Sequence, residues 1–237
     1  ALRKIIYINP ETFIVIDDLA TSGGKYEFEY WLNTLGDISF YDNNKGATIV
    51  DDHASMEVRA HYPENMKPHY IDFFAGPDLT PVPAPTVAQN ATDKRLYFQT
   101  EKTDATKIVT TLDVHRTGER VRNIKEENYG DYLKLSFEDG SVCYINLTDK
   151  EIIETKDDIS FKGLSFIYNK DSFMLTDGTY AKMDGKELFS SDVPVSVAKG
   201  KEEISVSSIY NEANIKLMGE KPEKLVKHND IRLYDIE

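Results

Sequence analysis

Three side chains with useful chemistry alternate along one strand-like stretch, Tyr26 to Asn33. Glu29, Trp31 and Asn33 are spaced two residues apart, and successive strand side chains point to opposite faces, so these three share a face. A flat aromatic ring can stack on a sugar ring while a neighbouring amide or carboxylate hydrogen-bonds the sugar hydroxyls. The pattern indicates a substrate-binding face. The alternative is that Trp31 belongs to the core and Asn33 closes a turn.

A second candidate group is the run Asp51, Asp52 and His53. Carboxylates and imidazoles are common metal ligands. Three consecutive residues rarely all face one ion, so we expect at most two of them to contribute. Asp51 and Asp52 are therefore candidate metal ligands, and the alternative interpretation is a solvated turn.

A third candidate group is Asp113, His115 and Arg116 at the end of the strand-like run Lys107 to Arg116, in which Asp113 and His115 share one face. The carboxylate could orient the imidazole, but the pattern favours an ordinary pair at the surface. The sequence contains no phosphate-binding loop, no Cys/His zinc spacing and no nucleophile elbow. Cys143, the only cysteine, stands among apolar residues and is predicted to be a buried strand thiol.

The elements that must position these residues are short strands. Phe28 and Tyr30 face away from Trp31, so we expect them to be buried between two sheets. Helical periodicity is nearly absent, apart from one possible short turn at Asp149 to Thr155. Asp-Gly between alternating runs is a strong hairpin signal, because Gly accepts the positive φ of tight turns. Such turns are predicted at Asp139-Gly140, Asp177-Gly178 and Asp184-Gly185.

The strand pattern predicts an all-β fold, a large antiparallel β-sandwich of two packed sheets. The 237 residues are interpreted as a single sandwich region, with a possible internal boundary near 117–128, where charged and polar residues accumulate. The Pro-rich stretch Gly76 to Lys94 is predicted to be a long loop, because proline cannot donate a hydrogen bond to a sheet.

The net charge of −13 limits the partners of the chain. Nucleic acids and anionic membranes attract clustered Lys and Arg, and the sequence has no dense basic run. No apolar run approaches the roughly 20 residues that span a bilayer. We therefore expect neither nucleic acid nor membrane as a partner.

The opening of the chain resembles the strands that begin the β-sandwich region of heparinase II/III-like polysaccharide lyases. In that family an Arg-x-hydrophobic run, a Pro turn and a hydrophobic-Val-x-Asp strand precede a strand of the type Phe-x-Trp-Leu-x-His-Thr. The corresponding residues here are Arg3, Pro10, Val15-Ile16-Asp17 and Phe28 to Thr34. The resemblance continues more weakly through most of the chain. It departs from the family at Asn33, where His is usual.

The resemblance implies the C-terminal sandwich region of such a lyase, without its helical catalytic domain. These enzymes cleave uronic-acid-containing polysaccharides by β-elimination, and the sandwich forms one wall of the substrate cleft. The implied partners are an acidic polysaccharide or oligosaccharide and the missing N-terminal helical domain of the same protein. The implied location is periplasmic or secreted. The chain alone is expected to be inactive.

The resemblance also implies roles for single residues. Asn33 stands at the position of a catalytic His, although an amide does not exchange protons near neutral pH. The family places a metal-ligating acid soon after that strand, which points to Asp51 or Asp52. No cofactor is required by the chain itself, but the parent enzyme could bind a divalent ion, Zn or Ca. The alternative function is a freestanding carbohydrate-binding or structural sandwich module.

Overall fold

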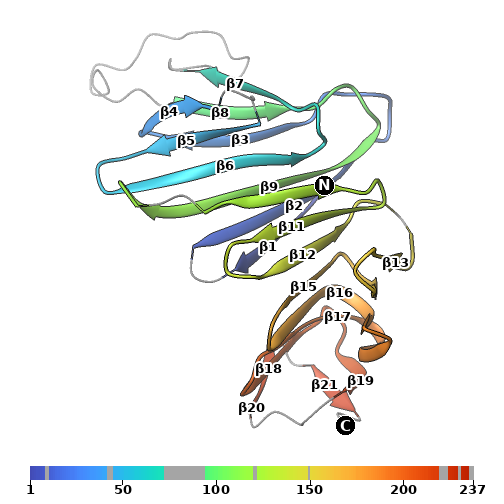
Figure 1. Ribbon diagram of the computed structural model, residues 1–237. Coiled ribbons are helices and arrows are strands. Elements are labelled where there is room, and N and C mark those ends of the chain that lie inside the picture. Colours follow the sequence, from blue (N-terminus) through green and yellow to red (C-terminus); the bar gives the residue numbers. More distant parts are fainter. Residues whose placement is uncertain are drawn as a thin grey trace. The chain divides into compact units, whose positions relative to one another are not determined.

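The protein is an all-β structure made of packed, mainly antiparallel sheets, as the sequence predicts (Figure 1). The computed structural model describes residues 1–8, 11–41, 45–71, 94–119, 122–148, 150–218, 224–228 and 231–234. Within these ranges no segment forms a helix long and apolar enough to cross a membrane. Most of the predicted Gly76 to Lys94 loop lies outside the described residues.

The chain folds into two compact units, Ala1–Arg122 and Asn123–Glu237. The division falls inside the 117–128 stretch, where strand β10 (Ile124–Asn128) begins unit 2. Each unit has a hydrophobic cluster composed of its own residues. The two units are therefore described separately.

Unit 1 is a sandwich of a six-stranded sheet, in the order β1-β2-β9-β6-β5-β4, and a three-stranded sheet, in the order β3-β8-β7. Figure 1 shows β3, β8 and β7 side by side. The strands of unit 1 are β1 (Leu2–Ile8), β2 (Thr12–Ala20), β3 (Glu29–Thr34), β4 (Asp37–Phe40), β5 (Gly46–Val50), β6 (Ala54–Tyr62), β7 (Lys67–Ile71), β8 (Lys94–Gln99) and β9 (Ala105–Arg116).

The core of unit 1 contains side chains from both sheets. Tyr30 and Phe98, from the three-stranded sheet, are only 2% and 0% exposed. They cluster with Val58 and Ile108 of the six-stranded sheet. Phe28 precedes the first residue of β3, is half-buried and packs against the same cluster. The prediction of a buried face is therefore confirmed for Tyr30 and only partly for Phe28.

Unit 2 is built on a twelve-stranded sheet whose main path is β10-β11-β12-β15-β16-β17-β18-β20, with four more strands attached beside it. Most pairs are antiparallel, but β18 pairs with β20, and β19 with β21, in parallel. Besides β10, its strands are β11 (Tyr132–Phe137), β12 (Val142–Asn146), β13 (Ile153–Glu154), β14 (Ile159–Lys162), β15 (Ser165–Asn169), β16 (Ser172–Met183), β17 (Lys186–Lys199), β18 (Glu203–Ser207), β19 (Glu212–Leu217), β20 (Lys224–His228) and β21 (Arg232–Tyr234).

Aromatic side chains dominate the core of unit 2. Tyr144, Phe161, Phe166 and Phe189 are all 0% exposed, and they belong to one cluster with aliphatic residues from the neighbouring strands. Cys143 is also completely buried, as predicted, and its burial raises the pKa of the thiol. A buried neutral thiol of this kind is a packing residue and a poor nucleophile.

Two of the predicted Asp-Gly turns are present and one is wrong. Asp184 and Gly185 join β16 to β17 with φ of 50° and 77°, the left-handed geometry of a tight hairpin. Gly140, with φ of 85°, lies between β11 and β12. Asp177-Gly178 instead lies inside β16, at a register irregularity against β17. A Cβ on Gly178 would lie 2.5 Å from the Lys162 carbonyl oxygen, so this glycine permits close strand approach.

The possible helical turn at Asp149 to Thr155 is also wrong in its described part. Residues 150–152 form no regular element, and Ile153–Glu154 forms the short strand β13, which pairs with β14. Ile153 is only 1% exposed and joins the core of unit 2. Tertiary packing of this side chain has therefore outweighed local helical preference, while Asp149 lies outside the described residues.

Candidate functional site

The three-stranded sheet of unit 1 turns the predicted substrate-binding residues away from its core. Glu29, Trp31 and Asn33 lie on β3 and alternate with the buried Tyr30. The β3–β8 register places Gln99, Tyr97 and Arg95 opposite them, and the β8–β7 register adds Lys67, His69 and Ile71. This surface is named the outer face: Glu29, Trp31, Asn33, Arg95, Tyr97, Gln99, Lys67, His69 and Ile71.

Three aromatic rings form the middle row of the outer face. The ring centroids of Trp31 and Tyr97 are 4.2 Å apart with an interplanar angle of 17°. Those of Tyr97 and His69 are 4.6 Å apart with an angle of 11°. All three side chains are half-buried. Cross-strand neighbours therefore stack face to face across the whole sheet, which is the direct consequence of their register.

Glu29 positions two residues of the outer face. Nε1 of Trp31 donates a hydrogen bond to Oε2 of Glu29 at 2.9 Å, and Nε2 of Gln99 donates to Oε1 at 3.1 Å. Burial raises the pKa of the Tyr97 phenol, and the negative charge of Glu29 adds to this effect. The phenol therefore stays neutral near physiological pH, and the indole is held in one orientation by an ionised acceptor.

On the other side of the aromatic row, Asn33 lies opposite Arg95. Asn33 is exposed and Arg95 is half-buried. An amide can both donate to and accept from sugar hydroxyls, and a guanidinium presents a planar fork of donors that matches a carboxylate. The outer face thus combines aromatic surface with groups suited to hydroxyls and to an acidic substituent.

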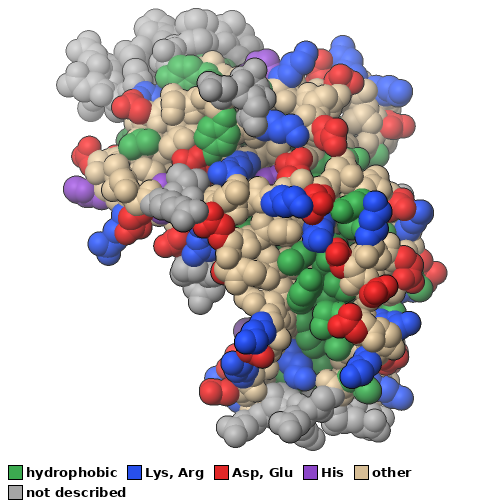
Figure 2. All heavy atoms as spheres, viewed as in Figure 1, with side chains coloured by type: hydrophobic (Ala, Val, Ile, Leu, Met, Phe, Trp, Pro, Cys, Tyr) green, Lys and Arg blue, Asp and Glu red, His purple; other side chains and the backbone are tan. Residues whose placement is uncertain are grey.

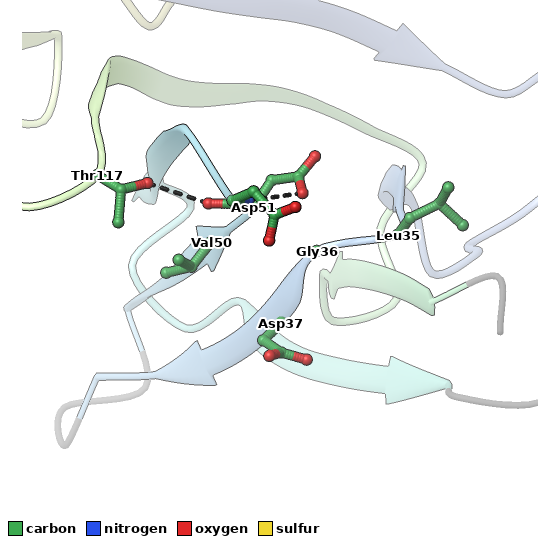
Figure 3. A pocket seen from close by; sticks show the side chains of 7 residues that line it. Leu35, Gly36, Asp37, Val50, Asp51 and Thr117 are labelled. Atoms are coloured by element: carbon green, nitrogen blue, oxygen red, sulfur yellow. Dashed lines mark hydrogen bonds between the residues drawn. The ribbon is translucent and has the colours of Figure 1, made fainter. Parts of the chain in front are cut away.

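Asp51 and Asp52 line a different feature, an open pocket of about 340 Å³ that also includes Asp37 (Figure 3). Oδ1 of Asp51 accepts the backbone N–H of Asp52 at 2.7 Å, and the Asp51 carbonyl accepts the Thr117 hydroxyl at 3.0 Å. The Asp37 side chain points away from Asp51 in Figure 3. It accepts a hydrogen bond from Lys94, which lowers the pKa of the Asp37 carboxyl.

This pocket offers little to a metal ion. In the described part of the chain, no group of three or more His, Cys, Asp or Glu side chains is placed to hold one. One oxygen of Asp51 is already used in its own turn. The assignment of Asp51 and Asp52 as metal ligands therefore stays a prediction, and no step of the proposed function depends on it.

Asp113 and His115 are buried, with 3% and 8% exposure, so the surface pair that the sequence favoured is wrong. Asp113 accepts hydrogen bonds from the Thr12 hydroxyl at 2.8 Å and from the backbone N–H of Arg122 at 3.3 Å. Nδ1 of His115 is buried without a hydrogen-bond partner. These groups therefore lie on a buried polar face of β9, whereas Val114 and Arg116 on the opposite face are exposed.

Sequence reasoning missed Glu57, which pairs with Asp113 across β6 and β9. Glu57 is only 4% exposed and accepts a hydrogen bond from the Thr48 hydroxyl at 2.9 Å. Burial raises the pKa of the Glu57 carboxyl, Asp113 raises it further, and Arg59 and His115 oppose the shift. In the alternating run Ser55 to Tyr62, Glu57 shares a strand face with Ser55, Arg59 and His61, and this pattern carries no sign that the face is buried.

Sequence reasoning also missed the partners of Trp31. The sequence favours strands at His69 to Ala75 and Arg95 to Glu101, and alternation places Tyr97 and His69 each on a definite face of its own strand. No local pattern indicates that β8 lies between β3 and β7, or in which register. The aromatic row was therefore not predictable from the sequence.

Comparison with known proteins adds no assignment: no protein-family profile matches this sequence, and no curated protein matches it. The structure defines an all-β protein with a display of stacked aromatic rings on one sheet. The resemblance to heparinase II/III-like lyases stays a prediction.

Proposed function

We propose that the chain is a non-catalytic β-sandwich portion of a heparinase II/III-like polysaccharide lyase. In the parent enzyme its outer face would form one wall of the cleft that holds an acidic polysaccharide. The observation that carries this proposal is the row of Trp31, Tyr97 and His69, bordered by hydrogen-bonding side chains on both sides. Aromatic surface beside amide and guanidinium groups suits a sugar with hydroxyl and carboxylate substituents.

The charge distribution favours recognition of single acidic groups over capture of a polyanion by a broad basic surface. On the side of the molecule seen in Figure 2, Lys and Arg side chains alternate with Asp and Glu and do not gather in one patch. The outer face itself has two cations, Lys67 and Arg95, beside the anionic Glu29. A uronate carboxylate would then be held by the Arg95 fork at one position.

Neither Asn33 nor Tyr97 of the outer face is an effective proton acceptor for β-elimination, which needs a base that removes the C5 proton, and Nε2 of the imidazole on this face, His69, is buried. Asn33 does not exchange protons near neutral pH. The Tyr97 phenolate that could act as a base is disfavoured, because burial and Glu29 raise the pKa of Tyr97. These features support a binding role for this chain, with the chemistry supplied by the missing helical domain.

A titration of the full 237-residue chain with defined tetrasaccharides tests this function. Trp31 is the sole tryptophan, so its fluorescence reports binding at the outer face directly. We expect a saturable change with alginate or heparan sulfate tetrasaccharides and no rise in the ultraviolet absorbance of unsaturated uronate. A rise in that absorbance, or the lack of any binding to either ligand, would contradict the proposal.

A freestanding carbohydrate-binding module is the second candidate. It is favoured by the fact that every residue of the outer face comes from this chain. Cellotetraose, which has no carboxylate, separates the two functions. Binding of cellotetraose as tight as that of the acidic tetrasaccharides would favour a general module over a wall of a uronate-specific cleft.

A further inference from the structure

We infer that the outer face holds a single sugar residue against the outer side of the Trp31 indole, at the β3 edge of the sheet. A glycan does not lie flat across the three rings. This inference rests on the proposed function and adds the place and orientation of the contact. It makes Trp31 the residue that touches the sugar, and Glu29 and Tyr97 positioning residues behind it.

The stacking distances exclude the middle of the aromatic row as a sugar platform. Tyr97 has Trp31 on one side at 4.2 Å and His69 on the other at 4.6 Å. Carbon atoms in contact are already about 3.5–4.0 Å apart, so no sugar ring fits between these rings. Both faces of Tyr97 are therefore occupied, and only the two terminal rings each keep one face for a ligand.

The two ends of the row differ in exposure. At the β3 end, the neighbours of Trp31 on the same strand, Glu29 and Asn33, are both exposed. At the β7 end, Nε2 of His69 is buried and Ile71 is only 9% exposed. Both β3 and β7 are edge strands of the sheet as described, so the two ends differ in the exposure of these neighbouring groups and not in strand pairing. The accessible terminal ring is therefore the indole, which is also the larger one.

The indole is preorganised for contact with a sugar, because its neighbours fix its orientation. Its Nε1 is bound by Glu29, and its inner side rests on Tyr97, so the outer side is presented in a fixed orientation. Asn33 lies two residues further along β3, about 7 Å away at the usual rise of a strand. Its amide is thus placed to hydrogen-bond the hydroxyls of a sugar that packs on the indole.

Alanine substitutions along the row distinguish two binding modes. In the edge-on mode the sugar packs on the indole at the β3 edge of the sheet, and in the flat mode the glycan lies across all three rings. The probe is alginate tetrasaccharide, and calorimetric titration gives the dissociation constant without a fluorescent reporter. Trp31→Ala is expected to weaken binding by about tenfold or more, the loss expected for a stacked aromatic contact. His69→Ala is expected to stay within about twofold of the unaltered chain, since this ring touches no ligand.

Three further variants test the positioning roles. Tyr97→Phe keeps the supporting ring and is expected to bind within about twofold of the unaltered chain, whereas Tyr97→Ala is expected to weaken binding. Glu29→Ala should weaken binding and also red-shift the Trp31 emission, because it frees the indole. Trp31→Phe, which keeps a smaller ring, should bind with intermediate affinity and guards against a folding defect in Trp31→Ala.

The outcomes separate this inference from the proposed function. Equal losses for His69→Ala and Trp31→Ala would mean that the glycan lies across the row, which overturns the edge-on mode and leaves the glycan-binding function intact. No binding of the tetrasaccharide by the unaltered chain would overturn the function itself. Transfer of magnetisation from indole protons to sugar C–H groups, retained in His69→Ala, would support the edge-on mode.

Discussion

The two units use aromatic side chains in different ways. On the outer face of unit 1, Trp31 and Tyr97 stack with centroids 4.2 Å apart, and both are half-buried. In the core of unit 2, Phe166 lies 6.1 Å from Phe161 and 6.0 Å from Phe173, and Phe166 is completely buried. Rings in the core pack with each other and cluster with aliphatic neighbours. Rings in the outer row stack on each other, and in the proposed function the outer side of the terminal indole contacts the ligand.

A carboxylate also stands beside the rings in each unit, and in both units it lies at the surface. In unit 1, Glu29 is exposed and orients the side chain of a candidate binding residue. In unit 2, Asp157 accepts a hydrogen bond from the Tyr144 hydroxyl at 2.7 Å and another from Lys134 at 2.8 Å. Under the proposed function, the aromatic row at the open edge of unit 1 serves recognition, whereas the enclosed rings of unit 2 serve stability.

Removal of an aromatic ring is expected to have the largest effect on stability, and its size should differ between the two units. Phe166→Ala is expected to destabilise unit 2 by about 3–5 kcal/mol, because it empties a large buried site. Trp31→Ala is expected to cost unit 1 less, about 1–2 kcal/mol, because part of the indole already faces water. Hydrogen exchange of the full chain, resolved by peptide, reports the two units separately. Equal losses of stability in the two variants would show that Trp31 is packed like an ordinary core residue.

Loss of one hydroxyl gives a smaller effect. Tyr144→Phe removes the hydrogen bond to Asp157, and we expect a loss of about 1–2 kcal/mol, the usual value for a bond to a charged group. Tyr97→Phe is the matched control on the outer face, expected within about 0.5 kcal/mol of the unaltered chain. Urea unfolding followed by tyrosine near-ultraviolet circular dichroism measures both. A loss as large for Tyr97→Phe would contradict the contrast between the faces.

The smallest expected effect is on the pH dependence of stability. Its sign should differ between Asp157 in unit 2 and Glu57 in unit 1. Hydrogen bonds from Lys134 and Tyr144 lower the pKa of Asp157 below its ordinary 3.8. The folded state therefore binds the proton less tightly than the unfolded state, and this stabilisation is present above pH 3.8 and lost as pH falls through the folded pKa. In the Asp157→Asn variant, the stability of unit 2 should therefore fall less steeply as the pH is lowered into this range.

In unit 1, Glu57 gives stability a pH dependence of the opposite sign. Burial raises its pKa above the ordinary 4.5, so its stabilising contribution is present below pH 4.5 and lost as pH rises through the folded pKa. Glu57→Gln should therefore gain stability relative to the unaltered chain between pH 4.5 and 7. Hydrogen exchange at a series of pH values measures both variants. The same sign of pH dependence for both carboxylates would contradict their different environments.

The strands themselves were largely predictable, because the signals are local. The run Tyr132 to Phe137, which leads into the Asp139-Gly140 turn, reads as a strand from the sequence and has the same bounds as β11. The Asp184-Gly185 turn followed from the φ that glycine tolerates. The same reasoning failed at Asp177-Gly178, because a glycine that allows close strand approach carries the same local signature as one that turns the chain.

What the sequence by itself determined about the candidate site is that Glu29, Trp31 and Asn33 share one face, because the two-residue period of a strand is set by the backbone. It also determined that Tyr30 points the other way, toward the core. Only the tertiary structure decided which side chains stand beside them. Tyr97 and His69 reach Trp31 through the register of β3, β8 and β7, and register depends on the packing of distant segments. The burial of Glu57 was decided in the same way, since a polar strand face reveals nothing locally about what will cover it.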